Sequence, residues 1–187
     1  MQRIMLAFVI TVAALSQAAA QDVPARLRQV EALVQQNKPT EALAALDETA
    51  AVLWEQAPLT FRRALWVDGK PGGFGVFNPR ANAVFDAATP MLAYAEPVGF
   101  GWQRDGETWR TDLAVGIVIK ERSGREIGRQ DNFGRLQIAS RLKNREFMTD
   151  FTYTLRGLPP GSYQIETRIR DAVSGKSGSF TLPFTVR

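Results

Sequence analysis

The sequence predicts a mainly β protein, in which an antiparallel β-sandwich follows two short helices. From Phe61 onward, apolar and polar residues alternate in a series of short runs, as in strands with one buried and one solvated face. Before Pro58, the chain is rich in Ala, Leu, Gln and Glu, and its apolar residues recur at helical spacing. Short strands separated by Gly, Pro, Asn and Asp favour two stacked sheets.

Residues 1–20 have the three parts of a secretory signal peptide. Arg3 supplies the positive charge, Ile4–Leu15 is apolar and uncharged, and Ser16–Ala20 places small residues three and one positions before a cleavage site after Ala20. The apolar run is shorter than the roughly 20 residues that a membrane-spanning helix needs. We therefore expect export to the periplasm, or secretion beyond it, and no stable membrane anchor after cleavage.

Residues 21–57 are predicted to form a helical hairpin. Asn37 can end the first helix, Pro39 cannot continue it, and Thr40 can cap the second. The stretch PTEALAALDETA resembles half of a tetratricopeptide unit, but such repeats need several copies to share a core. The hairpin is also too short to be stable alone. We expect its apolar stripes to dock either on the following domain or on another protein.

Residues 58–187 are predicted to form the sandwich. Alternation places Tyr163 and Ile165 on the buried face of one strand, and Gln164, Glu166, Arg168 and Arg170 on its outer face. Pro183 has no N–H for a ladder, so the last strand is expected to have an open side there, and the chain to end at or near a sheet edge. The predicted strands are Phe61–Val67, Met91–Glu96, Trp109–Lys120, Phe133–Leu142, Phe147–Leu155, Tyr163–Arg170 and Phe180–Val186.

The segment LPPGSY, Leu158–Tyr163, resembles the tyrosine corner of immunoglobulin-like and fibronectin type III domains. The resemblance implies that the Tyr163 hydroxyl bonds to the backbone just upstream, and that the fold is an immunoglobulin-like antiparallel β-sandwich. The segment GSYQIETRIRDAVSGKSGSFTLPFTV resembles the closing hairpin of exported bacterial immunoglobulin-like modules. Because the chain has no cysteine, it lacks the inter-sheet disulfide found in many of those domains.

A second resemblance covers the middle of the chain. FGVFNPR, then Phe85 and TPMLAYAEP, is similar to a pattern in exported bacterial proteins of unknown function. It extends the likeness over most of residues 60–187 and implies no activity.

The residue types that carry most catalytic and metal chemistry are scarce. The chain has no histidine and no cysteine, which removes the commonest general base and the commonest soft metal ligands. Asp105, Glu107 and Asp112 could hold calcium, but Asp105 and Gly106 also form a typical hairpin-turn pair. We therefore expect no catalytic residues, no bound metal and no cofactor.

The segment Ser174-Gly175-Lys176 is expected to be a turn whose lysine stays in solvent, where it would remain protonated and inert. The glycines around Lys70 do not have the order of a phosphate-binding loop. Neither segment is predicted to be a site.

Aromatic and arginine residues in loops are the candidate binding residues. This composition is typical of interface anchors and of surfaces that stack on carbohydrate, although the rings can instead cap the core. Arg80 and Glu96 are also expected to form a structural ion pair across neighbouring strands. The candidates are Phe77, Arg80, Phe100, Trp102 and Arg104.

The formal net charge is +4, and basic residues are interspersed with acids. The densest basic stretch, Arg141–Arg145, is short enough to be a solvated loop or strand edge, so we expect no nucleic-acid partner. The leading hypothesis is a non-enzymatic protein that binds another protein in the cell envelope. The alternative is a module that binds cell-wall glycan, and an enzyme ranks third.

Overall fold

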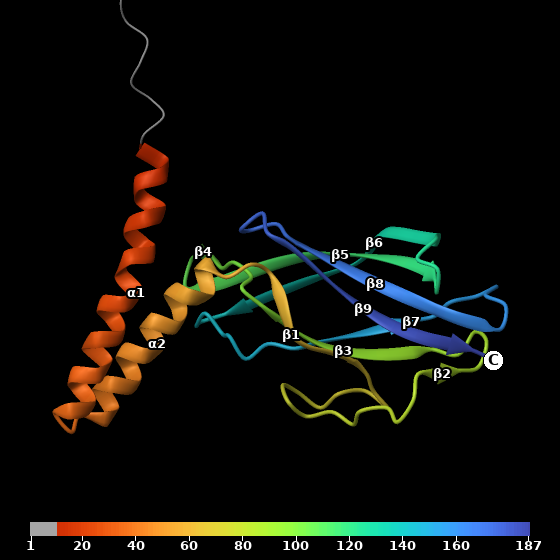
Figure 1. Ribbon diagram of the computed structural model, residues 1–187, viewed down its shortest axis with the longest axis horizontal. Coiled ribbons are helices and arrows are strands. Elements are labelled where there is room, and N and C mark those ends of the chain that lie inside the picture. The colour runs from red at the N-terminus through yellow and green to blue at the C-terminus, as the bar shows by residue number, and fades with distance from the viewer. Residues whose placement is uncertain (1–10) are drawn as a thin grey trace, which may run out of the picture. The chain divides into compact units, whose positions relative to one another are not determined.

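The computed structural model describes the backbone of residues 11–187 and the side chains of residues 23–187 (Figure 1). The chain divides after Gln56 into two compact units, a helical hairpin and a mainly β unit. Residues 1–10 of the predicted signal peptide lie outside the described part. No helix of the described part is both long and apolar enough to cross a bilayer.

The helical hairpin consists of α1 (Thr11–Gln35) and α2 (Pro39–Gln56). Asn37 ends α1 in the left-handed region, with φ at 56°, as expected for a C-terminal cap. The helix α2 begins at Pro39, whose missing N–H costs nothing in a first turn. Thr40 therefore lies inside that turn, and the expectation that it caps α2 is wrong.

The first helix starts before residue 21, so it includes the second half of the predicted signal peptide. Within the hairpin, Ala42 and Thr49 are buried, and the Thr49 hydroxyl donates to the Ala45 carbonyl at 2.8 Å. Large apolar side chains also remain exposed on both helices: Leu27, Val34, Leu43, Leu46 and Leu53.

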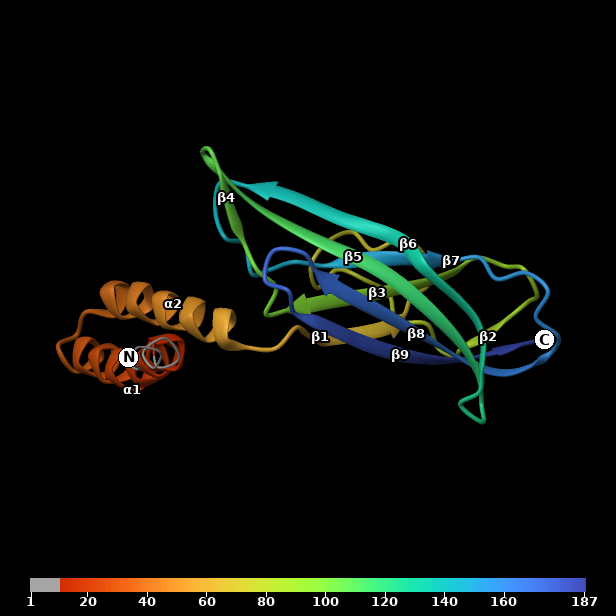
Figure 2. The same ribbon diagram turned by 90° about the horizontal axis from the view of Figure 1, so that it is seen from above.

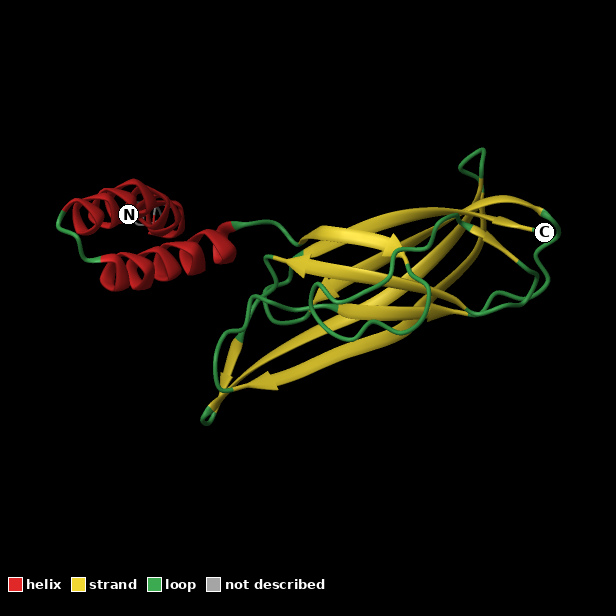
Figure 3. Cartoon of the chain, turned by 90° about the horizontal axis from the view of Figure 1, so that it is seen from below, coloured by secondary structure: helices red, strands yellow, loops and turns green. Residues whose placement is uncertain are grey.

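The β unit contains a three-stranded sheet, in the order β1-β3-β7, and a six-stranded sheet, in the order β2-β9-β8-β5-β4. The strand β6 pairs with β5 on the side away from β8. All pairings are antiparallel except that of β2 with β9. The six-stranded sheet is strongly twisted and curls like part of a barrel (Figures 2 and 3). The strands are β1 (Thr60–Trp66), β2 (Val84–Phe85), β3 (Met91–Val98), β4 (Gln103–Asp105), β5 (Thr108–Glu121), β6 (Glu126–Ser140), β7 (Thr149–Tyr153), β8 (Gly161–Asp171) and β9 (Ser177–Val186).

Side chains from both sheets meet in one apolar core. Phe61 of β1 and Phe151 of β7 contact Phe180 of β9, with ring centroids 4.8 and 5.9 Å apart respectively. On β5, the alternate residues Leu113 and Val115 are at most 1% exposed. The two-residue alternation thus buries one face of each long strand, and the expected mainly β fold with two N-terminal helices is confirmed.

The bounds of most strands differ from the predictions by a few residues, and four strands differ more clearly. The short strands β2 and β4 were not predicted, and β6 begins at Glu126 instead of Phe133. The strand β7 is shorter than the predicted Phe147–Leu155. The segments of β2, β4 and the first half of β6 carry little period-two apolar signal, because β2 and β4 have only two and three residues and the first half of β6 is mostly exposed.

Candidate functional site

Arg80 belongs to the structural framework of the loop that follows β1. Its Nη1 donates to Asp68 Oδ1 at 2.6 Å and its Nη2 donates to the Val84 carbonyl at 3.1 Å. The expected ion pair with Glu96 is wrong. Glu96 is buried and accepts a 2.7 Å hydrogen bond from the Tyr94 hydroxyl.

Phe77 lies in the same loop and stacks on Tyr94, with ring centroids 4.3 Å apart. The Tyr94 hydroxyl in turn accepts a 2.9 Å hydrogen bond from the Gly75 N–H. These contacts fix the loop to β3, so Phe77 and Arg80 both have structural partners within the β unit.

Phe100 and Trp102 belong mainly to the packed interior. Phe100 is 1% exposed and contacts Trp102 and Phe147, with centroids 5.4 and 5.6 Å away. The Trp102 indole nitrogen is buried, without a hydrogen-bond partner among the described residues. The alternative interpretation, that these rings cap the core, describes Phe100 better than a binding role does.

Arg104 is the one predicted binding residue that is exposed. Its Nε donates to the Gly106 carbonyl at 2.6 Å, and its guanidinium lies 5.3 Å from the Trp109 ring centroid. The Lys143 ammonium lies 4.5 Å from the same centroid. Since Arg104 comes from β4 on one side of Trp109 and Lys143 follows β6 on the other, cations flank this indole ring.

The two predicted structural residues occupy positions that explain their types. The Tyr163 hydroxyl donates to the Pro159 carbonyl at 2.8 Å, which is the contact that the tyrosine-corner resemblance implies. Pro183 lies in β9 opposite Gln164, just before the point where β2 joins the other edge at Thr185.

The structure also tests the predictions for two polar segments, the acidic turn at Asp105 and the turn that contains Lys176. Gly106 and Glu107 form the turn between β4 and β5, so the turn lies one residue later than the predicted Asp105–Gly106 pair. Within the described residues, no group of three or more acids is placed to hold a metal ion. Lys176 is half-buried, and its Nζ donates to the carbonyls of Ala57 and Gly99 at 2.7 and 2.8 Å. The expectation that this lysine lies in solvent is therefore wrong.

One depression in the β unit lies on the outer face of the six-stranded sheet. Its volume is about 610 Å³. We call it the sheet hollow and define it by the outward side chains of four strands. These are Ala114, Gly116 and Val118 of β5, Asp131 and Asn132 of β6, Glu166, Arg168 and Arg170 of β8, and Ser177 and Ser179 of β9.

The hollow exists because two outward positions of β5 carry small side chains. The β5–β6 register pairs Val115 with Gly134 and Ile117 with Gln130, so residues 131–133 bulge over Gly116. A Cβ at Gly116 would lie 3.1 Å from the Asp131 carbonyl oxygen. Glycine therefore allows the close approach of the bulge.

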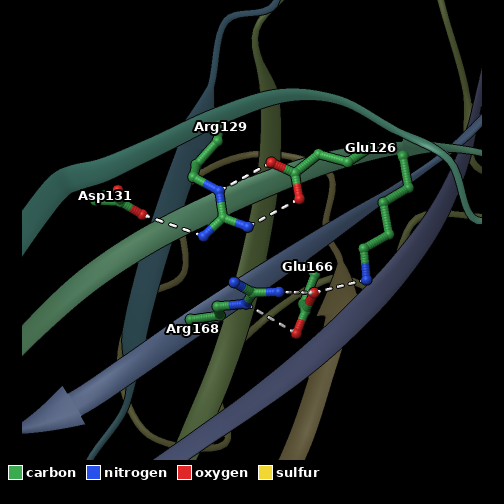
Figure 4. Close-up of polar contacts among 6 residues, drawn as sticks. Glu126, Arg129, Asp131, Glu166 and Arg168 are labelled. Carbon is green, nitrogen blue, oxygen red and sulfur yellow. Dashed lines mark hydrogen bonds and ion pairs between the residues drawn. The ribbon is translucent and has the colours of Figure 1, made fainter.

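Ion pairs cover the neighbouring part of the same face (Figure 4). We call Lys120, Glu126, Arg129, Asp131, Glu166 and Arg168 the ion-pair cluster. Arg168 binds Glu166 through Nε and Nη2 at 3.1 and 2.9 Å, and the Lys120 Nζ lies 2.8 Å from the same carboxylate. Arg129 makes two 2.8 Å hydrogen bonds to Glu126.

The cluster has two local consequences. Val118, which points outward between Arg129 of β6 and Glu166 of β8, is only 1% exposed. Hydrogen bonds from Arg168 and Lys120 lower the pKa of Glu166 from its usual 4.5 to about 2. The carboxylate thus stays charged near neutral pH and holds Arg168 beside the open floor formed by Gly116.

Sequence reasoning placed Glu166, Arg168 and Arg170 on an outer face but did not select them as a site. The available signal was the pair of small residues Ala114 and Gly116, within a strand otherwise rich in larger side chains. Glycine inside a strand often marks a bulge or a close approach. Only the strand register shows that these small residues lie beside the two arginines.

No family model matches the sequence, and no curated protein matches it either. One similar solved structure is the alkylpurine DNA glycosylase AlkC of Pseudomonas fluorescens, bound to DNA that contains an abasic site analog. The identity is 12% and the TM-score 0.38, and the match covers 86% of this chain and 42% of that chain. This chain thus spans less than half the length of that protein.

This finding contradicts two of our expectations, because the similar structure is an enzyme and is bound to DNA. We had expected no enzymatic activity and no nucleic-acid partner, and both expectations are withdrawn. At this TM-score, the likeness assigns neither glycosylase activity nor DNA binding to this chain.

Proposed function

We propose that this chain is exported to the periplasm, where it binds a protein partner with the outer face of the larger sheet of an immunoglobulin-like sandwich. The single observation that carries the binding role is the sheet hollow. It combines a floor of small residues with charged walls on an exposed sheet face. Concave sites with a few convergent polar groups are the usual places where proteins bind ligands.

The immunoglobulin-like assignment is supported by the Tyr163–Pro159 contact and by the core shared between two sheets. One pairing in the larger sheet, that of β2 with β9, is parallel and so differs from the all-antiparallel sandwich that the sequence predicted. Loops and sheet faces of such scaffolds are common sites of recognition.

A protein partner fits the face better than a neutral glycan does. Carbohydrate recognition commonly uses an open aromatic ring, whereas Arg104 and Lys143 both lie close to the Trp109 ring. The hollow itself is lined by small side chains and by charged side chains of both signs. Protein surfaces supply charges of both signs within a short distance, and complementary charges give specificity.

Site-specific photo-crosslinking in intact Gram-negative cells tests the binding role. A photoreactive phenylalanine at Ser179, in the hollow, is expected to give a discrete covalent adduct whose partner is identified by mass spectrometry. Thr152, exposed on the outer face of β7 in the other sheet, is the matched control position. Equal adducts from both positions, or none from Ser179, would count against the proposal.

Export has a separate test. The full chain with a C-terminal tag is expected in the periplasmic fraction, with an N-terminus at Gln21. Replacing Ala18 and Ala20 by lysine should leave the chain unprocessed, because signal peptidase needs small residues at those positions. A cytoplasmic protein that still begins at Met1 would refute export.

A further inference from the structure

Donor groups converge on the open part of the sheet hollow. Arg168 and Arg170 are two residues apart on β8, so both side chains leave the same face of the sheet. Two of the guanidinium donors of Arg168 are already bound to Glu166. Arg170 is exposed, and its side chain makes no ion pair or hydrogen bond with any residue in the described part of the chain.

The strand register surrounds Arg170 with small and hydroxyl side chains. Ser177 of β9 lies directly opposite Arg170, and Ser179 lies opposite Arg168. On the other side, Ala114 is the partner of Arg170. The space above the sheet is therefore open next to Arg170, and the groups that border it can donate hydrogen bonds.

A guanidinium has five donors and no acceptor, and a hydroxyl can donate one hydrogen bond. The planar fork of arginine matches the two oxygens of a carboxylate. An anionic oxygen group is thus the chemistry that would satisfy Arg170 and Ser177 together.

The charged side chains at the border of the hollow favour one class of anionic ligand over another. Glu166 and Asp131 are both acidic residues at its border, each beside an arginine. A polymer with a charge on every unit would bring negative groups next to these carboxylates, at a cost in repulsion. A polypeptide can present one carboxylate between neutral or basic residues, and it therefore fits the mixed walls better.

We propose that the sheet hollow binds a carboxylate of a partner protein segment, with Arg170 as the primary contact and Ser177 as a second donor. This inference rests on the proposed function, since it names the chemistry that the partner presents to the same face. Glu166 holds Arg168 beside the site. There the remaining N–H groups of Arg168 add positive charge without closing the hollow.

The test is a nuclear magnetic resonance titration of the full chain with two short peptides. The first is acetyl-Gly-Ser-Glu-Ser-Gly-amide, and the second has glutamine in place of its glutamate. The glutamate peptide is expected to give saturable shifts of the Arg170 Nε–H and of the Gly178 and Ser179 amides. For so few contacts, Kd should be on the order of 1 mM and should rise with salt.

Three variants sharpen the test. Arg170→Gln should weaken binding of the glutamate peptide by about three- to tenfold. Arg170→Lys should keep part of the affinity, since it retains the charge and loses the fork. Arg122→Gln is the matched control, because Arg122 is exposed and has no ion pair in the described part of the chain. Its affinity should equal that of the unmodified chain.

Several results would overturn the inference. Equal shifts with both peptides would rule out a carboxylate, and no shift at the hollow would rule out the site. Tighter binding of polygalacturonate or of a single-stranded oligonucleotide, at the same resonances, would show that the ligand class is wrong. If Arg170→Gln leaves the Ser179 crosslink unchanged, the inference fails while the proposed function stands. Absence of that crosslink from the unmodified chain overturns both.

Discussion

The indole nitrogen of Trp66 in β1 donates a 2.8 Å hydrogen bond to the carbonyl of Pro183 in β9. This bond joins the three-stranded sheet to the six-stranded sheet. The Trp66 ring also lies edge-on to Phe85, Tyr153 and Phe184. One side chain thus supplies both packing across the core and a polar link to the last strand.

Trp66→Phe should destabilise the β unit. The substitution keeps an aromatic ring but removes the donor, so the loss should be at least about 1 kcal/mol for the hydrogen bond, plus a cost for the smaller ring. Urea unfolding measures it. Trp109→Phe is the control, because Trp109 is half-buried and its ring lies beside Arg104 and Lys143. Equal losses in the two variants would show that the link to Pro183 contributes nothing.

Two tyrosine hydroxyls should differ in their contribution to stability. Tyr153 and Thr167 are fully buried with their oxygens 2.7 Å apart, and burial raises the pKa of Tyr153. Tyr153→Phe leaves the Thr167 hydroxyl buried without this partner, at a cost of about 1–3 kcal/mol. Tyr163→Phe leaves the carbonyl of the exposed Pro159 open to water, so it should cost only about 0.5–1.5 kcal/mol.

Chemical denaturation of both variants provides the comparison. Each substitution removes a single oxygen, so differences in ring packing are small and the two losses can be compared directly. A larger loss for Tyr163→Phe would mean that the corner hydroxyl matters more than the buried pair, which the accessibility of Pro159 does not support.

Much of the β unit could be predicted from the sequence, for an identifiable reason. In β8, the residues Tyr163, Ile165 and Ile169 are buried while Arg168 and Arg170 are not. The long paired strands repeat this pattern because one face of each covers the core. Asn37 and Pro39 likewise marked the break between the helices, through backbone preferences that act locally.

The candidate site could not be predicted because it depends on register. Gly116 and Arg168 are 52 positions apart in the chain, and only the β5–β8 pairing brings them side by side. The predicted site failed for a related reason. Phe100 lies in a loop that reads as exposed, yet contacts with Trp102 and Phe147 bury it.

Gly178 sets the approach of the chain before β1 to the strand β9. A Cβ at Gly178 would lie 2.2 Å from the Leu59 carbonyl oxygen, a backbone atom that cannot rotate away. Gly178→Ala should therefore push these segments apart and cost about 1–3 kcal/mol, as overpacking typically does. Differential scanning calorimetry should show a lower Tm.

Gly134→Ala is the matched control for this prediction. Gly134 is also a strand residue, and a Cβ there would have nothing within 4 Å. Alanine should leave Tm unchanged or raise it slightly, because it restricts the unfolded chain. The interpretation of Gly178 would be wrong if both variants melted together.

The ion-pair cluster should make stability depend on pH in the acidic range. The pKa of Glu166 is lowered in the folded chain from 4.5 to about 2. A carboxyl with a depressed pKa stabilises the folded state above its unfolded pKa, and this contribution disappears as the pH falls towards the folded value. The difference in unfolding free energy between the unmodified chain and Glu166→Gln should therefore be constant above about pH 5 and shrink towards pH 2. Arg168→Gln keeps the carboxylate but removes the largest cause of its shift, so in this background the decline should still begin near the unfolded pKa, but it should be smaller and complete at a higher pH. Unfolding by urea across this pH range measures all three proteins, and a constant difference down to pH 2 would show that Glu166 gains nothing from Arg168 and Lys120.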